Sequence, residues 1–458
     1  MFKGLMAGVS GIRGVVGEGM TPEVALLWSG GFGTWVKGGK VVVARDPRTS
    51  GDMLNLAVKA GLAAAGCDVD DAGMIPTPVG ALAVERRGAA GGIVITASHN
   101  PQQWNALKFI RSDGRMLTAN DFTDLERIVV EGPLRTVGWD RLGTVYDWDG
   151  AGMAYLGAVT GINFLDLERL NRKRLKVAID CVNGAGSFLY PELLEALGCE
   201  VVSIHCDGSG LFPHVAEPLP ENLGDLCRTV VEEQCAIGFA VDPDGDRLAI
   251  VDEKGTPIGE ELTLALAVKT VLEIQSGPVV VNSLTSQVIN DIADMYDVEC
   301  HRTRVGEANV AAKIMEIQAV VGGEGNGGVI LPQVHTVRDG GVGMAIVLNR
   351  LATRRGKVSE LVDQLPKYRM IKSSYPVTGI EPHELLEEIS ASYEHDQVSR
   401  IDGVRVSYED GWVQIRPSNT EPILRVYAES TNIEHARSMI EEMQNHLRRI
   451  VTQRKENE

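Results

Sequence analysis

The first region of the chain alternates short apolar runs with stretches of helical periodicity. Valine-rich or isoleucine-rich segments read KVVVAR at 40–45 and GGIVITA at 91–97. Between them, Leu54, Val58 and Leu62 recur at every fourth position, which places them on one face of a helix. Buried strands that alternate with amphipathic helices are typical of βαβ units. The sequence therefore predicts an α/β fold in this region.

The same rhythm begins again twice along the chain. LKVAID at 175–180 and PVVVNS at 278–283 are further valine-containing strands, each followed by a small polar loop and a helix-compatible segment. An internal three-fold repeat is one interpretation of this pattern. Within the first unit, Thr118 with Asp121 three residues later predicts a capped helix through DFTDLERIVV.

The last part of the chain, from about residue 371, has a different pattern. GVRVSY, WVQIRP and ILRVYAES are strand-like and are followed by a helical stretch from about Ile433, which together predict a smaller α+β unit. Polar segments rich in glycine or proline are the candidate linkers, at 131–150, 253–261 and 366–376.

Composition and charge narrow the classes of function. The 458 residues are too many for one core, so three or four domains are expected, and 44% apolar residues supply enough material to build them. No run approaches the roughly 18 apolar residues of a membrane span, and seven scattered cysteines without a CxxC pair fit reduced thiols, so we predict a cytoplasmic protein. The net charge of −18 argues against nucleic-acid or membrane partners, so an anionic substrate must meet local cationic groups and backbone amides.

The segment TASHNP at 96–101 follows a strand of buried type, where open α/β sheets display reactive side chains. Ser98 has a hydroxyl that can form a phosphate ester, and His99, Asn100 and the rigid Pro101 would fix the loop around it. The alternative interpretation is an ordinary Ser/Asn/Pro turn, which is the better one for this segment in isolation.

The segment DPDGDR at 242–247 places three carboxylates at alternate positions around a turn. Asp242, Asp244 and Asp246 would repel one another unless they spread into water or hold a cation, and hard oxygen ligands suit Mg²⁺. Arg247 follows directly and could steady a phosphoryl group beside that ion. An acidic β-turn is the alternative, and we favour the metal site.

Two further loops have the composition of ligand-binding loops. RPSNTEP at 416–422 offers a guanidinium, hydroxyls and an amide, which suits a phosphate, and its candidate residues are Arg416, Ser418, Asn419 and Thr420. GGEGNGG at 322–328 lacks the GxxxxGK[ST] form of a nucleotide loop, and Glu324 with Asn326 suits sugar hydroxyls better. Each loop taken alone could be a surface turn.

Taken in order, these segments resemble landmarks of the α-D-phosphohexomutase family, which includes phosphoglucosamine mutase and phosphomannomutase/phosphoglucomutase. The resemblance spans the whole chain and rests on SGIRG (10–14), ARDPRTSG (44–51), TASHNP, DCVNGAG (180–186), DPDGDR, TRVGEANV (303–310), GEGNGG (323–328) and RPSNTEP. It implies three similar α/β domains with mixed sheets and a C-terminal α+β domain, arranged around a central cleft. The ranges expected from the sequence are 1–150 with the serine loop, 151–255 with the metal loop, 256–369 with the sugar loop and 370–458 with the phosphate loop.

The resemblance also implies roles for individual residues. Ser98 would carry the phosphoryl group and, with Asp242, Asp244 and Asp246, hold Mg²⁺. Lys108 matches a candidate general acid or base, while Arg13, His99 and Arg247 match active-site positions. Glu324 and Asn326 would contact the sugar, and Arg416, Ser418, Asn419 and Thr420 the phosphate that does not react. The implied reaction interconverts a hexose 6-phosphate and a hexose 1-phosphate through a hexose 1,6-bisphosphate that turns over in the cleft.

Departures from the family pattern bear on the substrate. GEGNGG replaces a commoner GExSGH form, and WNALK at 104–108 replaces a commoner YNGxK form that keeps Asn105 and Lys108. Both variants favour glucosamine 6-phosphate as the substrate, with a phosphomannomutase/phosphoglucomutase as the alternative. A phosphatase that releases the phosphoserine group to water and a catalytically silent sugar-phosphate sensor are alternatives from other classes. A monomer or a homodimer is expected.

Overall fold

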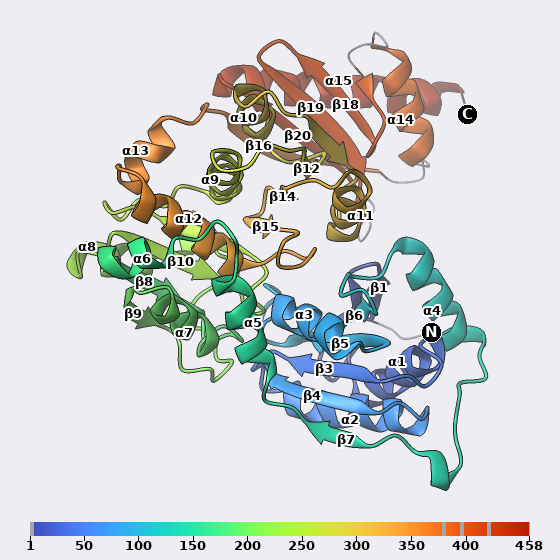
Figure 1. Cartoon of the computed structure of the whole chain (residues 1–458). Coiled ribbons are helices and arrows are strands. Elements are labelled where there is room, and N and C mark those ends of the chain that lie inside the picture. The colour runs from blue at the N-terminus through green and yellow to red at the C-terminus, as the bar shows by residue number, and fades with distance from the viewer. Residues whose placement is uncertain (1–3, 378–381, 394–397, 419–422, 458) are drawn as a thin grey trace.

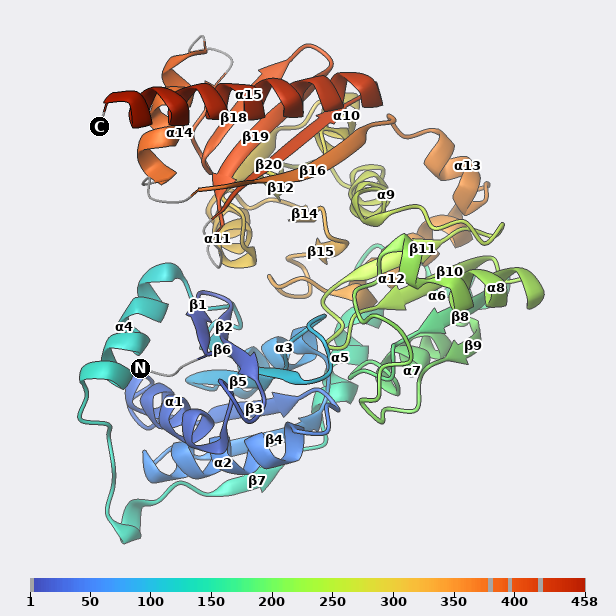
Figure 2. The same ribbon diagram turned by 180° about the vertical axis from the view of Figure 1, so that it is seen from behind.

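In the computed structural model of the protein, the strands of the described residues form four sheets that follow one another along the chain (Figures 1 and 2). The structure describes residues 4–377, 382–393, 398–418 and 423–457. Among these residues, no helix is long and apolar enough to cross a membrane.

The first region contains a seven-stranded sheet of order β1-β2-β6-β5-β3-β4-β7. Its elements are β1 (Met6–Gly8), β2 (Gly11–Val15), α1 (Pro22–Trp35), β3 (Val41–Arg45), α2 (Gly51–Ala64), β4 (Val69–Met74), α3 (Thr77–Arg87), β5 (Gly91–Ile95), β6 (Trp104–Arg111), α4 (Ala119–Glu131), the 3₁₀ turn η1 (Trp139–Arg141) and β7 (Val145–Asp147).

The second region contains a four-stranded sheet of order β11-β10-β8-β9. Its elements are α5 (Ala151–Thr160), α6 (Leu167–Lys173), β8 (Lys176–Asp180), α7 (Leu189–Ala196), β9 (Glu200–Ile204), the 3₁₀ turn η2 (Pro220–Asn222), α8 (Gly224–Glu232), β10 (Ile237–Val241) and β11 (Leu248–Val251).

The third region contains a four-stranded sheet of order β13-β12-β14-β15. Its elements are α9 (Glu260–Leu272), β12 (Val279–Asn282), α10 (Val288–Met295), β13 (Cys300–Thr303), α11 (Glu307–Ile317), β14 (Val321–Glu324), β15 (Gly328–Ile330), α12 (Gly340–Thr353) and α13 (Val358–Asp363).

The fourth region is an antiparallel sheet of order β16-β20-β19-β18-β17, against which a long helix lies (Figure 2). Its elements are β16 (Arg369–Pro376), α14 (Pro382–Ala391), β17 (Val398–Ser399), β18 (Val404–Tyr408), β19 (Gly411–Pro417), β20 (Ile423–Ser430) and α15 (Ile433–Asn457).

The first three sheets share one topology. In each, an antiparallel pair is followed by two parallel pairs, in the orders β6-β5-β3-β4, β11-β10-β8-β9 and β15-β14-β12-β13. The repeat inferred from the valine-rich strands and the predicted fold class are therefore confirmed. Because reactive loops collect at the carboxyl ends of parallel strands, three such sheets can offer equivalent loops to a shared space.

Local predictions were confirmed except in two expected linkers, of which 131–150 contains β7, paired with β4. Thr118 and Asp121 form a reciprocal capping box at the start of α4, and Leu54, Val58 and Leu62 are fully buried on α2. The linker expected at 366–376 was mostly wrong, because Arg369–Pro376 pairs along its whole length with β20 as an edge strand. Two prolines near its ends disguised the alternating pattern that marks a strand.

Apolar packing joins the first three regions and leaves the fourth with a core of its own. One continuous cluster includes Val79 of α3, Leu193 of α7 and Ile346 of α12. The other face of the first sheet packs separately against α1, α2 and α4. The C-terminal cluster contains only residues of the fourth region. The four ranges expected from the sequence remain our proposal for the domain boundaries.

A buried polar group ties the second region to the third. Asp339 is fully buried at the N-terminus of α12, where its Oδ1 accepts hydrogen bonds from the Gly341 and Val342 amides and from the Tyr155 hydroxyl at 2.7 Å. His335 Nε2 lies 2.8 Å from its other oxygen. The carboxylate thus caps one helix and fixes α5 against it.

We expect Tyr155→Phe to weaken the joint between α5 and α12. The substitution removes one hydrogen bond to a buried carboxylate, which costs about 1 to 3 kcal/mol of unfolding free energy. Scanning calorimetry should show a lowered melting temperature, while Tyr146→Phe, at a side chain exposed to solvent, should leave it unchanged. Equal melting of both variants and the parent chain would contradict this account.

Candidate active site

Ser98 lies just beyond the carboxyl end of β5, in the left-handed region of the backbone with φ of 49°. Its amide donates to Thr96 Oγ1 at 3.0 Å, and its hydroxyl donates to Asp242 Oδ2 at 2.6 Å. A non-glycine residue with positive φ is strained and persists where neighbouring contacts hold it. The serine and the aspartate loop, which are 144 residues apart in sequence, are in direct contact.

Arg48 holds the serine loop in that position. Its guanidinium is buried and donates to four carbonyl oxygens, those of Ser98 at 2.6 Å, Asn100 at 2.7 Å, Pro101 at 2.9 Å and Trp104 at 3.2 Å. Asp46 neutralises the charge, with its Oδ2 3.0 Å from Nε. The planar guanidinium of arginine, with its five N–H donors, is the one side chain group that can satisfy so many carbonyl groups at once.

The aspartate triplet occupies the turn between β10 and β11. Asp242, Asp244 and Asp246 are all at most 1% exposed, and one oxygen from each lies within 4.8 Å of the others. Within the described part of the chain, Asp244 Oδ1 and Asp246 Oδ1 are buried without a hydrogen-bond donor. Burial, together with the two neighbouring carboxylates, raises the pKa of Asp242 well above its usual value. The donor set and its uncompensated oxygens therefore fit a divalent cation.

Cationic side chains from two other regions reach this turn. Lys108 Nζ on β6 lies 2.5 Å from Asp244 Oδ2 and 3.3 Å from Asp246 Oδ2. Burial alone would favour the neutral amine, but the two carboxylates outweigh it and raise the pKa of Lys108. Arg338 Nη2 donates to Asp246 Oδ2 at 2.8 Å. The triplet is thus the point at which three regions of the chain meet.

Arg247 and His99 flank the serine and share one acidic partner. Arg247 donates to Glu217 Oε1 at 2.6 Å, and His99 Nε2 lies 3.9 Å from the same oxygen. Burial, followed by the charge of Arg247, lowers the pKa of His99 to about 4. The imidazole is therefore neutral at pH 7, and its Nδ1 lies 3.3 Å from Ser98 Oγ.

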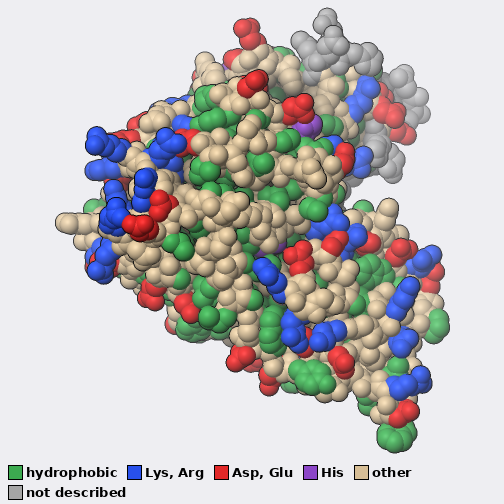
Figure 3. All heavy atoms as spheres, in the orientation of Figure 1, with side chains coloured by type: hydrophobic (Ala, Val, Ile, Leu, Met, Phe, Trp, Pro, Cys, Tyr) green, Lys and Arg blue, Asp and Glu red, His purple; other side chains and the backbone are tan. Residues whose placement is uncertain are grey.

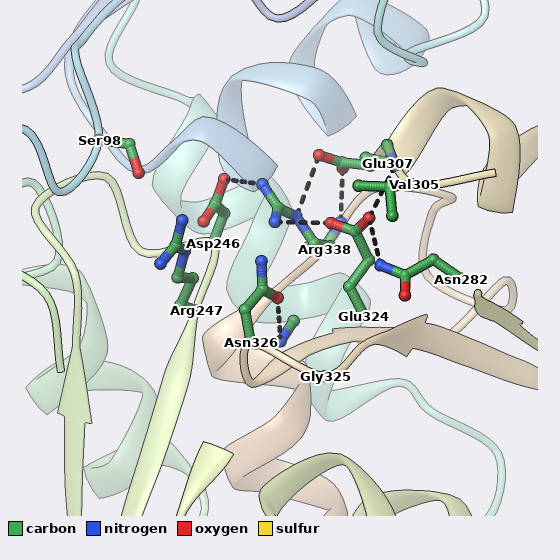
Figure 4. A network of polar contacts seen from close by, with 12 residues as sticks. Ser98, Asp246, Arg247, Asn282, Val305, Glu307, Glu324, Gly325, Asn326 and Arg338 are labelled. Carbon is green, nitrogen blue, oxygen red and sulfur yellow. Dashed lines mark hydrogen bonds and ion pairs between the residues drawn. The ribbon is translucent and has the colours of Figure 1, made fainter. Parts of the chain in front are cut away.

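Figure 4 shows how the predicted sugar loop meets the aspartate turn. Glu324 ends β14, accepts from Arg338 Nη1 at 2.9 Å and is 5% exposed. Arg338 also pairs with Glu307, whose Oε2 lies 3.2 Å from its Nε. Asn326 Oδ1 accepts from the Gly328 amide at 3.2 Å, which folds the loop back on itself. Arg338 links the loop that contains Glu324 to the aspartate turn, a role that the sequence did not reveal.

The predicted phosphate loop is described up to Ser418, so Asn419 and Thr420 lie outside the described residues. Arg416 stands directly opposite Arg425 in the register of β19 and β20, and Asp402 Oδ2 lies 3.1 Å from its Nε. Two guanidinium groups on opposed residues of a strand pair raise the local positive potential, which favours binding of an anion.

These groups line one cleft of about 490 Å³. Figure 3 shows the molecule hollowed between the first region and the fourth, with acidic and basic side chains at its inner end. Arg13 also lines the cleft and contacts Asn100 Oδ1 at 3.4 Å. The described predicted residues that line it are Arg13, Ser98, His99, Lys108, Arg247, Glu324, Arg416 and Ser418. The aspartates lie beneath Ser98 and Lys108, and Asn326 is absent from the lining.

Four family models match the chain in succession. They describe phosphoglucomutase/phosphomannomutase alpha/beta/alpha domain I at residues 4–134, domain II at 153–255, domain III at 259–368 and the C-terminal domain at 357–446. The chain belongs to the phosphoglucomutase/phosphomannomutase family.

Relatives of similar length carry two kinds of name. A "Probable phosphoglucosamine mutase" of Methanopyrus kandleri is 38% identical over 98% of this chain and 99% of its own. A "Phosphoglucomutase/phosphomannomutase" of Thermococcus kodakarensis is 36% identical over 96% and 97%. The crystal structure of a phosphoglucomutase/phosphomannomutase family protein from Burkholderia thailandensis superposes with a TM-score of 0.85 at 31% identity, covering 96% of this chain and 98% of that one.

Sequence reasoning missed the residues that position the site in this member of the family. Arg48 and Glu307 lie inside segments recognised as landmarks, but nothing in one sequence shows that they bind carbonyl groups or another side chain. Glu217 and Arg338 had no signal at all, since each acts through a partner distant in sequence, and Arg425 lies opposite Arg416 only through the pairing of β19 with β20.

We expect Mg²⁺ to raise the melting temperature of the protein, because it relieves repulsion among the three buried aspartates. At a concentration about 100 times its Kd, a ligand adds about 2.7 kcal/mol to the unfolding free energy. Differential scanning fluorimetry with Mg²⁺ and with EDTA measures the shift. Asp244→Asn should reduce it strongly, and Asp149→Asn, at an exposed position, should keep it. A shift that survives Asp244→Asn would place the ion elsewhere.

Proposed function

We propose that the chain is a phosphohexomutase that interconverts hexose 6-phosphate and hexose 1-phosphate, with glucosamine phosphate as its substrate. The supporting observation is one cleft that contains a hydroxyl in contact with an aspartate triplet and, in the same lining, a pair of opposed arginines. A sugar with a phosphate at each end needs both groups at once, one for transfer and one for anchoring.

The transfer starts from a phosphoserine at Ser98. The bond between phosphorus and Ser98 Oγ breaks while a bond forms to the free hydroxyl oxygen of the sugar monophosphate. The hydroxyl loses its proton, Ser98 Oγ gains one, and a hexose 1,6-bisphosphate results. After the bisphosphate turns over, the second phosphoryl group moves to Ser98 Oγ, which releases its proton, and the oxygen that the group leaves gains that proton. Lys108 is our candidate for holding that proton, because its amine lies in the cleft beside the aspartate turn.

The charged side chains around Ser98 support this chemistry. Asp242, Asp244 and Asp246, with the serine phosphate, would hold a Mg²⁺ ion, which supplies positive charge to the phosphoryl oxygens when bound. Arg247 and Arg13 line the same space and would orient the remaining oxygens. Arg416 and Ser418 would anchor the phosphate that does not react, and we extend that role to Asn419 and Thr420.

Glucosamine phosphate is favoured over mannose or glucose phosphates by three arguments. The GEGNGG loop departs from the GExSGH form, and several relatives at 33 to 38% identity carry the name "Probable phosphoglucosamine mutase". Glu324 lines the cleft as a carboxylate, which can accept a hydrogen bond from a 2-ammonium group. A phosphomannomutase/phosphoglucomutase is the second candidate, because one relative of 36% identity carries that name.

Ser98→Ala should abolish the covalent route and lower kcat by roughly 10³-fold to 10⁶-fold, as the loss of a nucleophile does elsewhere. A coupled isomerisation assay measures kcat on glucosamine, glucose and mannose 6-phosphates, with Mg²⁺ and the corresponding 1,6-bisphosphates present. Ser112→Ala, at an exposed position, should keep full activity. Near-normal turnover by Ser98→Ala would refute the mechanism, and release of inorganic phosphate without isomerisation would favour a phosphatase.

Arg48→Lys tests whether the serine loop must be held in place. A lysine cannot donate to four carbonyl groups at once, so Ser98 should shift and kcat should fall about 100-fold, with KM nearly unchanged. Steady-state kinetics separate the two constants. Arg86→Lys on the exposed face of α3 is the matched control. A raised KM at constant kcat would instead assign Arg48 to substrate binding.

A further inference from the structure

A second cluster of possible metal ligands lies in the second region, outside the cleft. It consists of Asp180 at the end of β8, His205 just after β9, and His214 in the loop that follows. One donor atom from each lies within 4.8 Å of the other two. None of these residues is used in the mechanism above.

Both imidazoles direct one nitrogen at the same carboxylate oxygen. His205 Nδ1 lies 3.0 Å and His214 Nε2 lies 3.1 Å from Asp180 Oδ2. The opposite nitrogens already face acceptors. His214 Nδ1 lies 2.8 Å from the Val215 carbonyl oxygen, which can only accept, so that nitrogen carries the hydrogen. His205 Nε2 lies 3.4 Å from Asp225 Oδ2, whose charge favours a hydrogen there too.

With a hydrogen on both outer nitrogens, each inner nitrogen either has a lone pair or belongs to an imidazolium ion. If each histidine is neutral with its hydrogen on the outer nitrogen, two lone pairs and a carboxylate face one another, which is repulsive unless a cation lies between them. The alternative is two imidazolium ions around one carboxylate, with ring centres 5.3 Å apart. A single divalent cation satisfies all three donors without placing like charges together.

Outer contacts of the cluster match those of protein metal sites. Metal-bound histidines commonly donate their second nitrogen to a carbonyl or carboxylate oxygen, as His214 does to the Val215 carbonyl, and ligating carboxylates are themselves hydrogen-bonded. Asp180 Oδ1 accepts from the Val182 amide at 2.8 Å. Asp180 itself is 1% exposed, whereas the two histidine side chains are 21% and 19% exposed, so solvent can reach the open side.

Three residues in the backbone around the cluster have strained conformations. Val182, Asn183 and His205 have φ of 47°, 52° and 48°, and the Asn183 amide donates to the His205 carbonyl at 2.6 Å. Positive φ is rare for a β-branched residue and costs about 1 to 3 kcal/mol at each position. Such strain persists where a functional arrangement of side chains requires it.

We propose that Asp180, His205 and His214 form a second metal site, which binds a borderline divalent ion of the Zn²⁺ class. Two imidazole nitrogens and one carboxylate oxygen suit Zn²⁺ or Co²⁺ better than Mg²⁺, which prefers oxygen. Water completes the coordination on the exposed side. The site is distinct from the aspartate triplet in both its residues and its metal preference.

The ion would fasten a loop that reaches the active site. The chain from His205 to Glu217 ends at the carboxylate that binds Arg247. On the other side, Gly184 packs against Pro243, and the Ala185 amide donates to the Pro243 carbonyl at 2.7 Å. The metal therefore positions both neighbours of the aspartate turn and takes no part in the transfer itself.

The test is a Co²⁺ titration of the chelator-treated full chain in the presence of excess Mg²⁺, which occupies the oxygen-rich triplet. We expect one equivalent of Co²⁺ to bind with the visible absorption of nitrogen-ligated cobalt, and Zn²⁺ to displace it. Asp242→Asn should retain this signal, and so should His435→Gln, a histidine of the fourth region that also pairs with an aspartate.

His205→Gln and His214→Gln, made separately, should each weaken Co²⁺ binding at least tenfold and together abolish the absorption. Circular dichroism and the Mg²⁺-dependent melting shift confirm that each variant is folded. If a variant fails to fold, the cobalt spectrum of the parent chain alone tests the proposal. Absence of a nitrogen-type cobalt spectrum in the parent chain, or an undiminished one in either folded variant, overturns the proposal.

Discussion

The structure depends on how three carboxylates are kept together inside the protein. Asp242, Asp244 and Asp246 are buried on one turn, and such a turn folds only if positive charge reaches it. Lys108 supplies that charge from the first region and Arg338 from the third. The electrostatic requirement of the turn therefore dictates the geometry of the cleft, because it draws three sheets to one point.

Much of the fold followed from the sequence because its signals are local. Valine-rich strands such as 278–283, the capping pair Thr118 and Asp121, and the buried face of α2 each depend on residues a few positions apart. The strand Arg369–Pro376 escaped detection, since its pairing with β20 joins residues 47 to 61 positions apart, and Pro366 and Pro376 indicate a break. Pairing between distant segments leaves no mark in a single chain.

The residues of the candidate site show the same difference between local signals and contacts across distant segments. Ser98 and the aspartates carry reactive groups in recognisable segments, so their proximity could be foreseen. Arg48, Glu217 and Arg338 act by holding other groups, and any arginine or glutamate on the surface would look the same in sequence. The resemblance to the family indicated which residues carry the reactive groups. The contacts that hold those groups in place could be identified only in the three-dimensional structure. Which residues touch the sugar stays a prediction.

The separate core of the fourth sheet has a mechanical consequence. Among the residues that the structure describes, that sheet shares no apolar cluster with the others, and its contacts with the third region include polar ones, such as Gln414 with Ser283 and Glu429 with the Gln287 amide. Interfaces of this polar kind permit rigid-body rotation more readily than a fused interior does. The arginine-bearing wall of the cleft can thus swing as a unit, which would give the proposed intermediate, with a phosphate group at each end, room to reverse without escaping.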